Sequence, residues 1–309
     1  MIAVLGECVA DAFADRRPGE LALRVLPGGG PANTAVALAR LGASTRFLGR
    51  LSDDVFGELF RERLSASGVD LSACVRAREP STLAVATLDA EGQARYSFHA
   101  EGTADWEWSA AELSDDRLGG VSCLHTGSLT LVREPGAGAV AAFVGRAAAT
   151  VSIDPNVRPS LASREDYLER LPLWCALADI LKLSADDLAF LMPDAPVGRA
   201  CEILHAAGAR LVVVTMGASG ALVSLDGAVA TVPAVPVEVV DTVGAGDSFT
   251  AGLLHALESR GLLGGRLDGL DLASAAAAAA LGARVAALTC EVAGADPPWA
   301  DRLTSQPAP

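Results

Sequence analysis

The chain has 309 residues, of which 51% are hydrophobic, and its 38 acidic and 24 basic residues give a formal net charge of −14. This much apolar sequence can bury a core without disulfides or metals, and it excludes a disordered polymer, which needs low hydrophobicity beside its charge. The acidic excess argues against nucleic acid as a partner, and no cluster of Lys and Arg offers a basic face.

No stretch of the sequence is expected to cross a membrane, since a spanning helix needs about 20 consecutive apolar residues. Polar residues interrupt Leu211–Leu225, and the alanine run at 275–280 lies between Asp271 and Arg284. The N-terminus has no basic residues ahead of its apolar stretch, which argues against a signal peptide. Six cysteines without a C-x-x-C pair favour reduced thiols. These features predict a cytoplasmic protein without a membrane partner.

From the N-terminus onward, apolar runs of strand length alternate with segments of helical spacing. Met1–Gly6 predicts a buried strand, and Pro31–Leu41 predicts a helix with proline at its start and glycine just beyond its end. Such alternation is typical of a mostly parallel sheet with helices on both faces. Further strands are predicted at Thr45–Gly49, Val121–His125, Val151–Asp154, Ile180–Lys182 and Leu211–Thr215, and further helices at Asp53–Ser67, Glu134–Ala148 and Pro196–Ala207.

Two regions near the front of the chain interrupt this alternation. The segments at about 11–26 and 72–101 contain short β-like pieces, with a turn predicted at Asp89–Gly92. Four short strands inserted there predict a small separate sheet, which is suited to cover a cleft as a lid. We therefore expect one α/β domain over residues 1–309 with a discontinuous β lid. The segment Ala221–Val240 predicts antiparallel strands at the edge of the main sheet.

The most informative stretch is DTVGAGDSFTAGLL at 241–254, where a glycine-rich turn leads into a helical pattern from about Ala245. Gly244 and Gly246 let consecutive N–H groups point at one spot, and such groups at the start of a helix bind phosphate. Asp247 would repel a phosphate unless it had a separate task, and taking a proton from an attacking hydroxyl is such a task. The alternative is that Asp247 only caps the helix.

A second glycine-rich stretch, GGGPANTAVALARLG at 28–42, also leads into a helix. Asn33 in its first turn favours a hydroxyl-rich ligand. The stretch is close to a dinucleotide fingerprint, but Asn33 replaces the last glycine and Pro31 stands where the turn should tighten. The sequence has no Walker A motif, so a nucleotide must be held in another way.

Together the two stretches resemble the signatures of the ribokinase-like (pfkB) carbohydrate kinase family, and most closely its fructokinase-like branch. Supporting matches such as GECVADAF, EGTADW, DPNVRPSL and VVVTMGASGAL follow one another over nearly the whole chain. The resemblance implies a ribokinase-like three-layer α/β sandwich with a mostly parallel central sheet and a small β-sheet lid. It also implies transfer of the γ-phosphate of ATP to a sugar hydroxyl with Mg²⁺, a monovalent cation such as K⁺ near the Asp241 loop, and a homodimer formed through the lid.

The resemblance further implies roles for the residues that match the family's motifs. Asp247 matches the base that takes the proton from the sugar hydroxyl, and Gly244, Ala245 and Gly246 match the amides of the anion hole. Positions that match the sugar site are Asp11, Gly29, Gly30, Asn33 and Arg158. Positions that match the surroundings of the nucleotide phosphates are Lys182, Thr215, Gly217 and Gly220.

Several of these residues also have a simpler interpretation. Asp11 is alternatively a solvated turn residue, Arg158 a partner of Asp154, and Thr215 merely the end of a strand. Lys182 is a single charge in an apolar run, so a phosphate or an acidic side chain is expected as its partner.

Two positions depart from the family pattern. Ser184 and Asp187 stand where an N-x-x-E motif usually orders magnesium-bound water, and an aspartate still suits a hydrated Mg²⁺. His99 and Ala100 stand where a Tyr-Arg pair often reaches the sugar, so His99 is either a substrate contact on the lid or a solvent-facing histidine. Fructose is the favoured substrate, with ketodeoxygluconate, ribose and nucleosides as alternatives. A non-catalytic sugar or nucleotide sensor and a dinucleotide-dependent oxidoreductase are the hypotheses from other classes.

Overall fold

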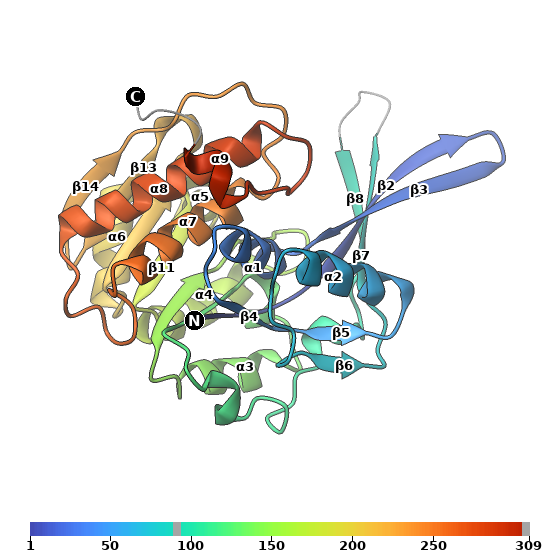
Figure 1. Ribbon diagram of the computed structural model, residues 1–309, viewed down its shortest axis with the longest axis horizontal. Helices are drawn as coiled ribbons and strands as arrows, with labels where there is room; N and C mark the ends of the chain where they lie inside the picture. Colours follow the sequence, from blue (N-terminus) through green and yellow to red (C-terminus); the bar gives the residue numbers. More distant parts are fainter. Residues whose placement is uncertain (89–93, 305–309) are drawn as a thin grey trace.

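The computed structural model describes residues 1–88 and 94–304. Within these ranges an eight-stranded sheet forms the centre of the molecule (Figure 1), in the order β14-β13-β12-β11-β10-β9-β1-β4. Neighbouring strands from β12 to β4 are parallel, whereas β13 and β14 form an antiparallel edge. The strands are β1 (Ile2–Leu5), β4 (Thr45–Leu48), β9 (Cys123–Gly127), β10 (Thr150–Asp154), β11 (Ile180–Ser184), β12 (Leu211–Thr215), β13 (Ala221–Leu225) and β14 (Ala228–Val232).

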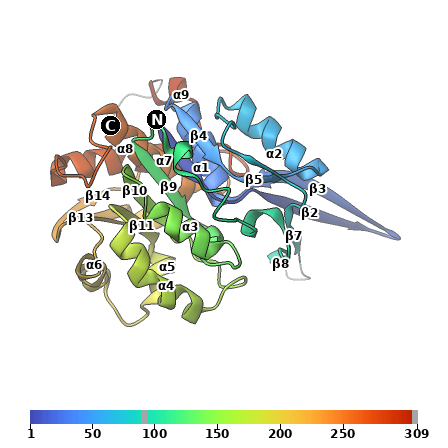
Figure 2. The same cartoon turned by 90° about the horizontal axis from the view of Figure 1, so that it is seen from below.

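Helices cover both faces of this sheet and enclose two hydrophobic cores (Figure 2). Successive side chains of a strand point to opposite faces, so Val213 packs in one core while Val212 and Val214 pack in the other. Burial on both faces explains why these strands are continuous apolar runs. One face carries α1 (Gly30–Arg40), α2 (Val55–Ala66), α7 (Ala245–Ser259) and α8 (Leu272–Cys290), and the other carries α3 (Ala137–Val144), α4 (Arg164–Leu177), α5 (Ala185–Leu191) and α6 (Val197–Ala206).

The predicted α/β sandwich is therefore confirmed, although the bounds of several elements differ from those expected. The helix predicted from Asp53 begins at Val55, because the Asp54 carboxylate accepts a hydrogen bond from the Gly57 amide and caps the helix. The helix predicted over Glu134–Ala148 is limited to α3. A short final helix, α9 (Ala300–Thr304), closes the described part of the chain.

A second, four-stranded sheet extends away from the main body (Figure 1), in the order β3-β2-β7-β8. Its central strands β2 and β7 are parallel, and the outer pairs are antiparallel. The first part of the segment expected at 72–101 lies elsewhere, because β6 (Val75–Ala77) pairs with β5 (Arg50–Ser52). The turn predicted at Asp89–Gly92 lies outside the described residues. The strands are β2 (Val9–Arg17), β3 (Glu20–Gly28), β7 (Thr82–Leu88) and β8 (Ala94–His99).

Among the described helices, α8 alone is long and apolar enough to span a membrane by length and composition. It packs in the core against α7 and lies beside the edge strands β13 and β14. A Cβ atom on Gly252 of α7 would lie only 2.8 Å from the Gly282 Cα of α8. The alanine and glycine content of α8 is thus explained by close helix packing in the core.

Candidate active site

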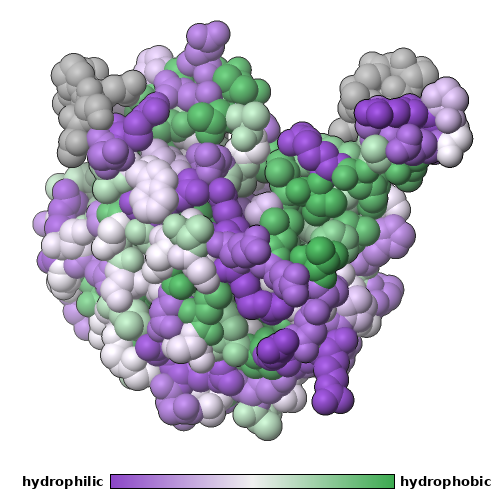
Figure 3. All heavy atoms as spheres, turned by 45° about the vertical axis from the view of Figure 1, so that its right-hand side comes forward, coloured by the Kyte–Doolittle hydropathy of each residue, from purple (hydrophilic) through white to green (hydrophobic). Residues whose placement is uncertain are grey.

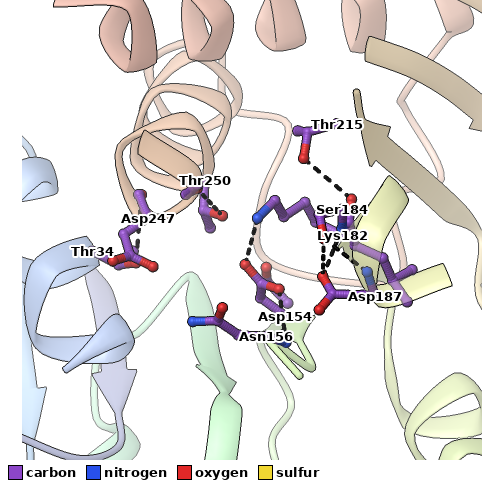
Figure 4. A network of polar contacts seen from close by, with 12 residues as sticks. Thr34, Asp154, Asn156, Lys182, Ser184, Asp187, Thr215, Asp247 and Thr250 are labelled. Carbon is purple, nitrogen blue, oxygen red and sulfur yellow. Dashed lines mark hydrogen bonds and ion pairs between the residues drawn. The ribbon is translucent and has the colours of Figure 1, made fainter. Parts of the chain in front are cut away.

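Polar residues gather at the edge of the main sheet where the parallel strands reach their carboxyl ends. Asp154 ends β10, Ser184 ends β11 and Thr215 ends β12. Figure 4 shows Asp247, in the first turn of α7, on the opposite side of this cluster from Ser184. Ligands of open α/β sheets bind at this edge, so these residues are the centre of the candidate site.

The turn before α7 is shaped by side-chain and backbone constraints, and its Ala245 amide donates to the Thr242 carbonyl oxygen at 3.2 Å. The Asp241 carboxylate accepts hydrogen bonds from the amides of Val243 (3.1 Å) and Gly294 (2.8 Å). Gly244 follows with φ 78°, and a Cβ atom on it would lie 2.7 Å from the Ala295 Cβ, so only glycine fits. Amides in the first turn of a helix have no partner within the helix. The position of this turn at the start of α7 is compatible with the anion-binding site expected from the sequence.

Asp247 is held beside this turn by the start of α1. Asn33 Nδ2 donates to Asp247 Oδ2 at 2.9 Å, and Asp247 Oδ1 lies 3.3 Å from where a Cβ on Gly30 would sit. Burial raises the pKa of Asp247 to about 6, against the lowering effects of the Asn33 hydrogen bond and the Lys182 charge. No side chain caps α7, so the helix-capping alternative for Asp247 is not supported.

Lys182 is buried on β11 and forms an ion pair across the sheet (Figure 4). Its Nζ lies 2.7 Å from Asp154 Oδ2, and a Cβ on Gly246 would lie 3.1 Å from the same Nζ. Burial lowers the pKa of Lys182, but the Asp154 carboxylate outweighs this and raises it above its usual value. The expected acidic partner is therefore present, and the ammonium also reaches the glycine-rich turn.

Arg158 lies at the rim of the site and does not form the ion pair with Asp154 considered from the sequence. Its Nη1 donates to the carbonyls of Asn156 (3.3 Å) and Val157 (3.1 Å), because Lys182 already occupies Asp154. The pairing hypothesis is wrong for this structure.

Asp11 projects from β2 onto the glycine turn that precedes α1. Any side chain on Gly28 would collide with the Asp11 carboxylate, and a Cβ on Gly29, the N-cap of α1 with φ 104°, would lie 2.5 Å from the Glu7 carbonyl oxygen. Burial raises the pKa of Asp11 to about 6, against the lowering effect of the Arg158 charge. The turn at 28–30 thus lies between the carboxylates of Asp11 and Asp247.

Asp187, which is expected to order magnesium-bound water, has a structural role at the start of α5. Its Oδ2 accepts hydrogen bonds from the Ser184 amide (2.7 Å) and hydroxyl (2.6 Å), and its Oδ1 accepts one from the Val157 amide (2.8 Å). Ser184 and Asp187 form a capping box at the start of α5. Both carboxylate oxygens therefore hold the start of α5 and the Val157 amide in place, a role that the sequence analysis did not anticipate.

The remaining residues expected near the nucleotide lie beyond Lys182, at the end of β12. Thr215 pairs in register with Ser184 and Ala221, and its Oγ1 lies 3.4 Å from the Leu183 carbonyl oxygen. Gly217 begins a short 3₁₀ turn, and the space around its Cα is open on the side that a Cβ would occupy. Gly220 ends the turn and packs against β14.

His99 does not share a sheet face with Asp11. In the small sheet Asp11 pairs with Ala84, which pairs with Phe98, whereas His99 pairs with Leu83 and so lies on the opposite face. His99 is also exposed. The expected substrate contact is corrected accordingly, and Phe98 is the β8 residue on the Asp11 face.

Sequence reasoning missed Asn156, which stands beside the glycine turn. A Cβ on Gly30 would lie 2.6 Å from its Nδ2, and its backbone adopts φ 43°, which is uncommon outside glycine. The DPNVRPSL stretch contained the signal, because an Asp-Pro-Asn sequence directly after a buried strand marks a polar turn at the carboxyl edge.

Comparison with known proteins shows which family this chain resembles along its length. The family model described as pfkB family carbohydrate kinase matches residues 1–302. A fructokinase of Rhizobium leguminosarum bv. trifolii is 40% identical over 270 residues, covering 85% of this chain and 81% of the relative. A fructokinase of Klebsiella pneumoniae is 37% identical over 265 residues, covering 84% and 85%.

Solved structures show the same fold. The crystal structure of a Xylella fastidiosa fructokinase with bound ATP superimposes with a TM-score of 0.87 at 29% identity, covering 95% of this chain and 93% of the other. An aminoimidazole riboside kinase from Salmonella enterica, complexed with aminoimidazole riboside and an ATP analogue, gives a TM-score of 0.82 at 28% identity, covering 98% of both chains.

Proposed function

Because the chain belongs to the pfkB family of carbohydrate kinases and is therefore an ATP-dependent sugar kinase of the fructokinase type, we propose that fructose is its substrate and Asp247 its general base. The family expected from the sequence motifs is confirmed, and the oxidoreductase and sensor hypotheses are not favoured. The observation that carries the residue assignment is the partly buried Asp247 carboxylate, held by Asn33 in the first turn of α7, next to the glycine-rich turn.

The chemistry that these residues provide is in-line phosphoryl transfer. Asp247 accepts the proton of a sugar hydroxyl as that oxygen bonds to the γ-phosphorus, and the bond from phosphorus to the ADP oxygen breaks. The amides of Gly244, Ala245 and Gly246, with the Lys182 ammonium, stabilise charge on the transferring phosphoryl group. Asp11, Gly29, Gly30 and Asn33 hold the sugar, with Arg158 near its outer side. In this scheme Thr215, Gly217 and Gly220 line the nucleotide.

In this scheme Mg²⁺ binds together with ATP and is not coordinated by a set of protein side chains alone. Among the described residues, no group of three His, Cys, Asp or Glu side chains could hold a metal ion. Mg²⁺ keeps several waters and is usually held by one or two carboxylates and substrate phosphates, so the site fits an ion carried by the nucleotide. A monovalent cation such as K⁺ beside Asp241 is proposed from the family resemblance.

A panel of acceptors tests the substrate proposal. ADP release from ATP is measured with fructose, ribose, ketodeoxygluconate and adenosine at matched concentrations. We expect the highest kcat/KM with fructose, and a higher value with any other acceptor would overturn the choice of sugar. ATP turnover that no sugar stimulates would overturn the kinase mechanism drawn from the site.

The pH dependence of the reaction follows from the two buried carboxylates. The pKa values of Asp247 and Asp11 are both raised to about 6, and both residues act as ionised groups. We therefore expect kcat/KM for the sugar to fall as the pH drops through about 6, with a limiting slope of about 2 on a logarithmic plot. Asp11→Asn removes one titrating group and should reduce that slope to about 1. An unchanged slope in this variant would remove Asp11 from the assignment.

The small sheet is proposed as the lid over the sugar and as the contact between two copies of the chain. Closure of a lid excludes water, which otherwise competes as the phosphoryl acceptor. Apolar side chains gather on this part of the surface (Figure 3), and both faces of the sheet carry exposed ones. By register Phe13 and Tyr96 share the face of Asp11, and Leu21 and Leu23 lie on the opposite face. Exposed apolar patches mark interaction sites. Together with the reduced thiols expected from the sequence, these features fit a cytoplasmic homodimer.

Sedimentation of two matched variants tests the dimer. Leu23 on β3 and Leu173 on α4 have similar exposed fractions of 43% and 47%. We expect Leu23→Glu to shift the enzyme to monomer and Leu173→Glu to leave the dimer intact, because a buried charge without a partner is costly only at the contact. A dimer unaffected by Leu23→Glu would place the contact elsewhere.

A further inference from the structure

A buried carboxyl group ties together the chain segments that enter and leave the small sheet. Asp105 lies in the 3₁₀ turn Ala104–Trp106, just after β8, and is 3% exposed. Its Oδ1 accepts a hydrogen bond from the Cys8 amide (2.9 Å), directly before β2. Its Oδ2 lies 2.6 Å from the Thr82 hydroxyl, at the first residue of β7. One side chain therefore joins three segments at the root of the sheet.

The contacts continue from Thr82 along a short chain of polar atoms. Thr82 Oγ1 lies 2.7 Å from Thr103 Oγ1, and Thr103 Oγ1 donates to the Ala100 carbonyl oxygen at 3.1 Å. This series of polar contacts runs from Asp105 through Thr82 and Thr103 to Ala100 and contains three hydrogen bonds. The Ala100 carbonyl at one end can only accept. Each threonine hydroxyl supplies one proton, so the two hydroxyls supply two. When all three contacts are hydrogen bonds, the third proton lies on the Asp105 carboxyl group at the other end, which then donates to Thr82.

The electrostatic surroundings favour the same protonation state. Burial raises the pKa of Asp105 to about 7, and the nearby Glu7 adds to this, while the contacts with the Thr82 hydroxyl and the Cys8 amide act in the opposite direction. The cations packed nearby are already engaged. Arg50 pairs with Glu79 and Glu112 and donates to the Ala104 carbonyl, and Arg133, over the Trp106 ring, pairs with Glu101.

We propose that Asp105 is a neutral carboxylic acid that locks the root of the small sheet and acts as a positioning residue for Asp11. In the register of the sheet, Val9 pairs with Thr82 and Asp11 with Ala84. Because Asp105 holds Cys8 next to Thr82, it fixes the register of β2 against β7 and with it the position of Asp11. Asp105 itself touches no substrate. The positioning half of this inference rests on the proposed role of Asp11 in sugar binding.

Two substitutions separate the neutral acid from a carboxylate. In Asp105→Asn the side-chain oxygen still accepts from Cys8, and the amide nitrogen donates to Thr82 and restores all three links. We expect this variant to keep kcat and the KM for sugar within about 3-fold of wild type. Asp105→Ala breaks the chain and is expected to raise the KM for sugar by about 10-fold or more, with smaller changes in kcat and in the KM for ATP. An asparagine variant as impaired as the alanine variant would overturn the proposal.

Substitution of the middle hydroxyl gives an independent kinetic test. Thr82→Val is expected to raise the KM for sugar as Asp105→Ala does, because both variants remove the hydrogen bond between Asp105 and β7. Thr87→Val on the same strand is the matched control, since the Thr87 hydroxyl contacts the Arg95 carbonyl at 3.4 Å, away from Asp105. Equal KM values for the two valine variants would count against the lock.

The protonation state has a readout that does not depend on sugar phosphorylation. In the unfolded chain an aspartate has a pKa of about 3.9. In the folded protein the pKa of Asp105 is raised to about 7. The folded state then binds more protons, so this group makes the free energy of unfolding fall as the pH rises from about 4 to about 7. Asp105→Asn removes that fall, and its stability relative to wild type should increase over this window. A relative stability that decreases would show an ionised Asp105 and overturn the proposal, whatever the acceptor panel reveals.

Discussion

The Asp247→Asn enzyme is expected to turn over sugar about 10²- to 10⁴-fold more slowly than the wild type, which is the usual range for loss of a general base. Asparagine has nearly the same volume, and its oxygen can still accept from Asn33, so the pocket is preserved. The KM for ATP is expected to change little, because the lost group acts on the proton that moves during the reaction. Steady-state kinetics at saturating ATP measure both quantities.

A matched control is available at the start of another helix. Asp186 lies in the first turn of α5, is exposed and carries the same carboxylate near the same edge of the sheet. Asp186→Asn is expected to leave kcat within about 2-fold of wild type, because a surface change away from the contacts has a small effect. Turnover of the Asp247 variant near that of the Asp186 variant would remove Asp247 from the chemistry.

The local parts of this site were predictable because their signals lie within a few residues. A glycine pair followed by helical spacing placed the start of α7 at Ala245, where the structure has it. The same logic placed Asn33 in the first turn of α1. In both cases backbone conformation and the helix start are determined by adjacent residues, which sequence reasoning can use directly.

The parts that depend on register or on distant partners were not predictable. The ion pair of Lys182 with Asp154 joins residues 28 positions apart, and it requires β10 and β11 to be neighbours in a particular register. The two alternatives for His99, a substrate contact and a solvent-facing histidine, could not be separated from the sequence because a shift of one residue reverses the face of every side chain in a strand. Asp187 was expected at a metal, but an Ser-x-x-Asp spacing at the start of a helix equally specifies a capping box, which is what forms.

Substitution of Lys182 is expected to have the largest effect on stability. The ion pair with Asp154 is nearly fully buried, with side-chain exposures of 5% and 7%. Removing one partner of a buried pair leaves an uncompensated charge and typically costs about 3–5 kcal/mol. We therefore expect Lys182→Met to lower the free energy of unfolding by about that amount, measured by urea denaturation at neutral pH.

A double variant separates the structural role of Lys182 from its role in the reaction. Asp154→Asn removes the carboxylate charge and keeps the Oδ1 atom that accepts from the Asn156 amide. Combined with Lys182→Met it should recover most of the lost stability, because no buried charge is left unpaired. Turnover should stay low, since the ammonium beside Gly246 is still missing from the phosphoryl site. Recovery of turnover together with stability would instead make Lys182 a purely structural residue. The amides of the α7 turn would then stabilise the transferring phosphate without the Lys182 ammonium.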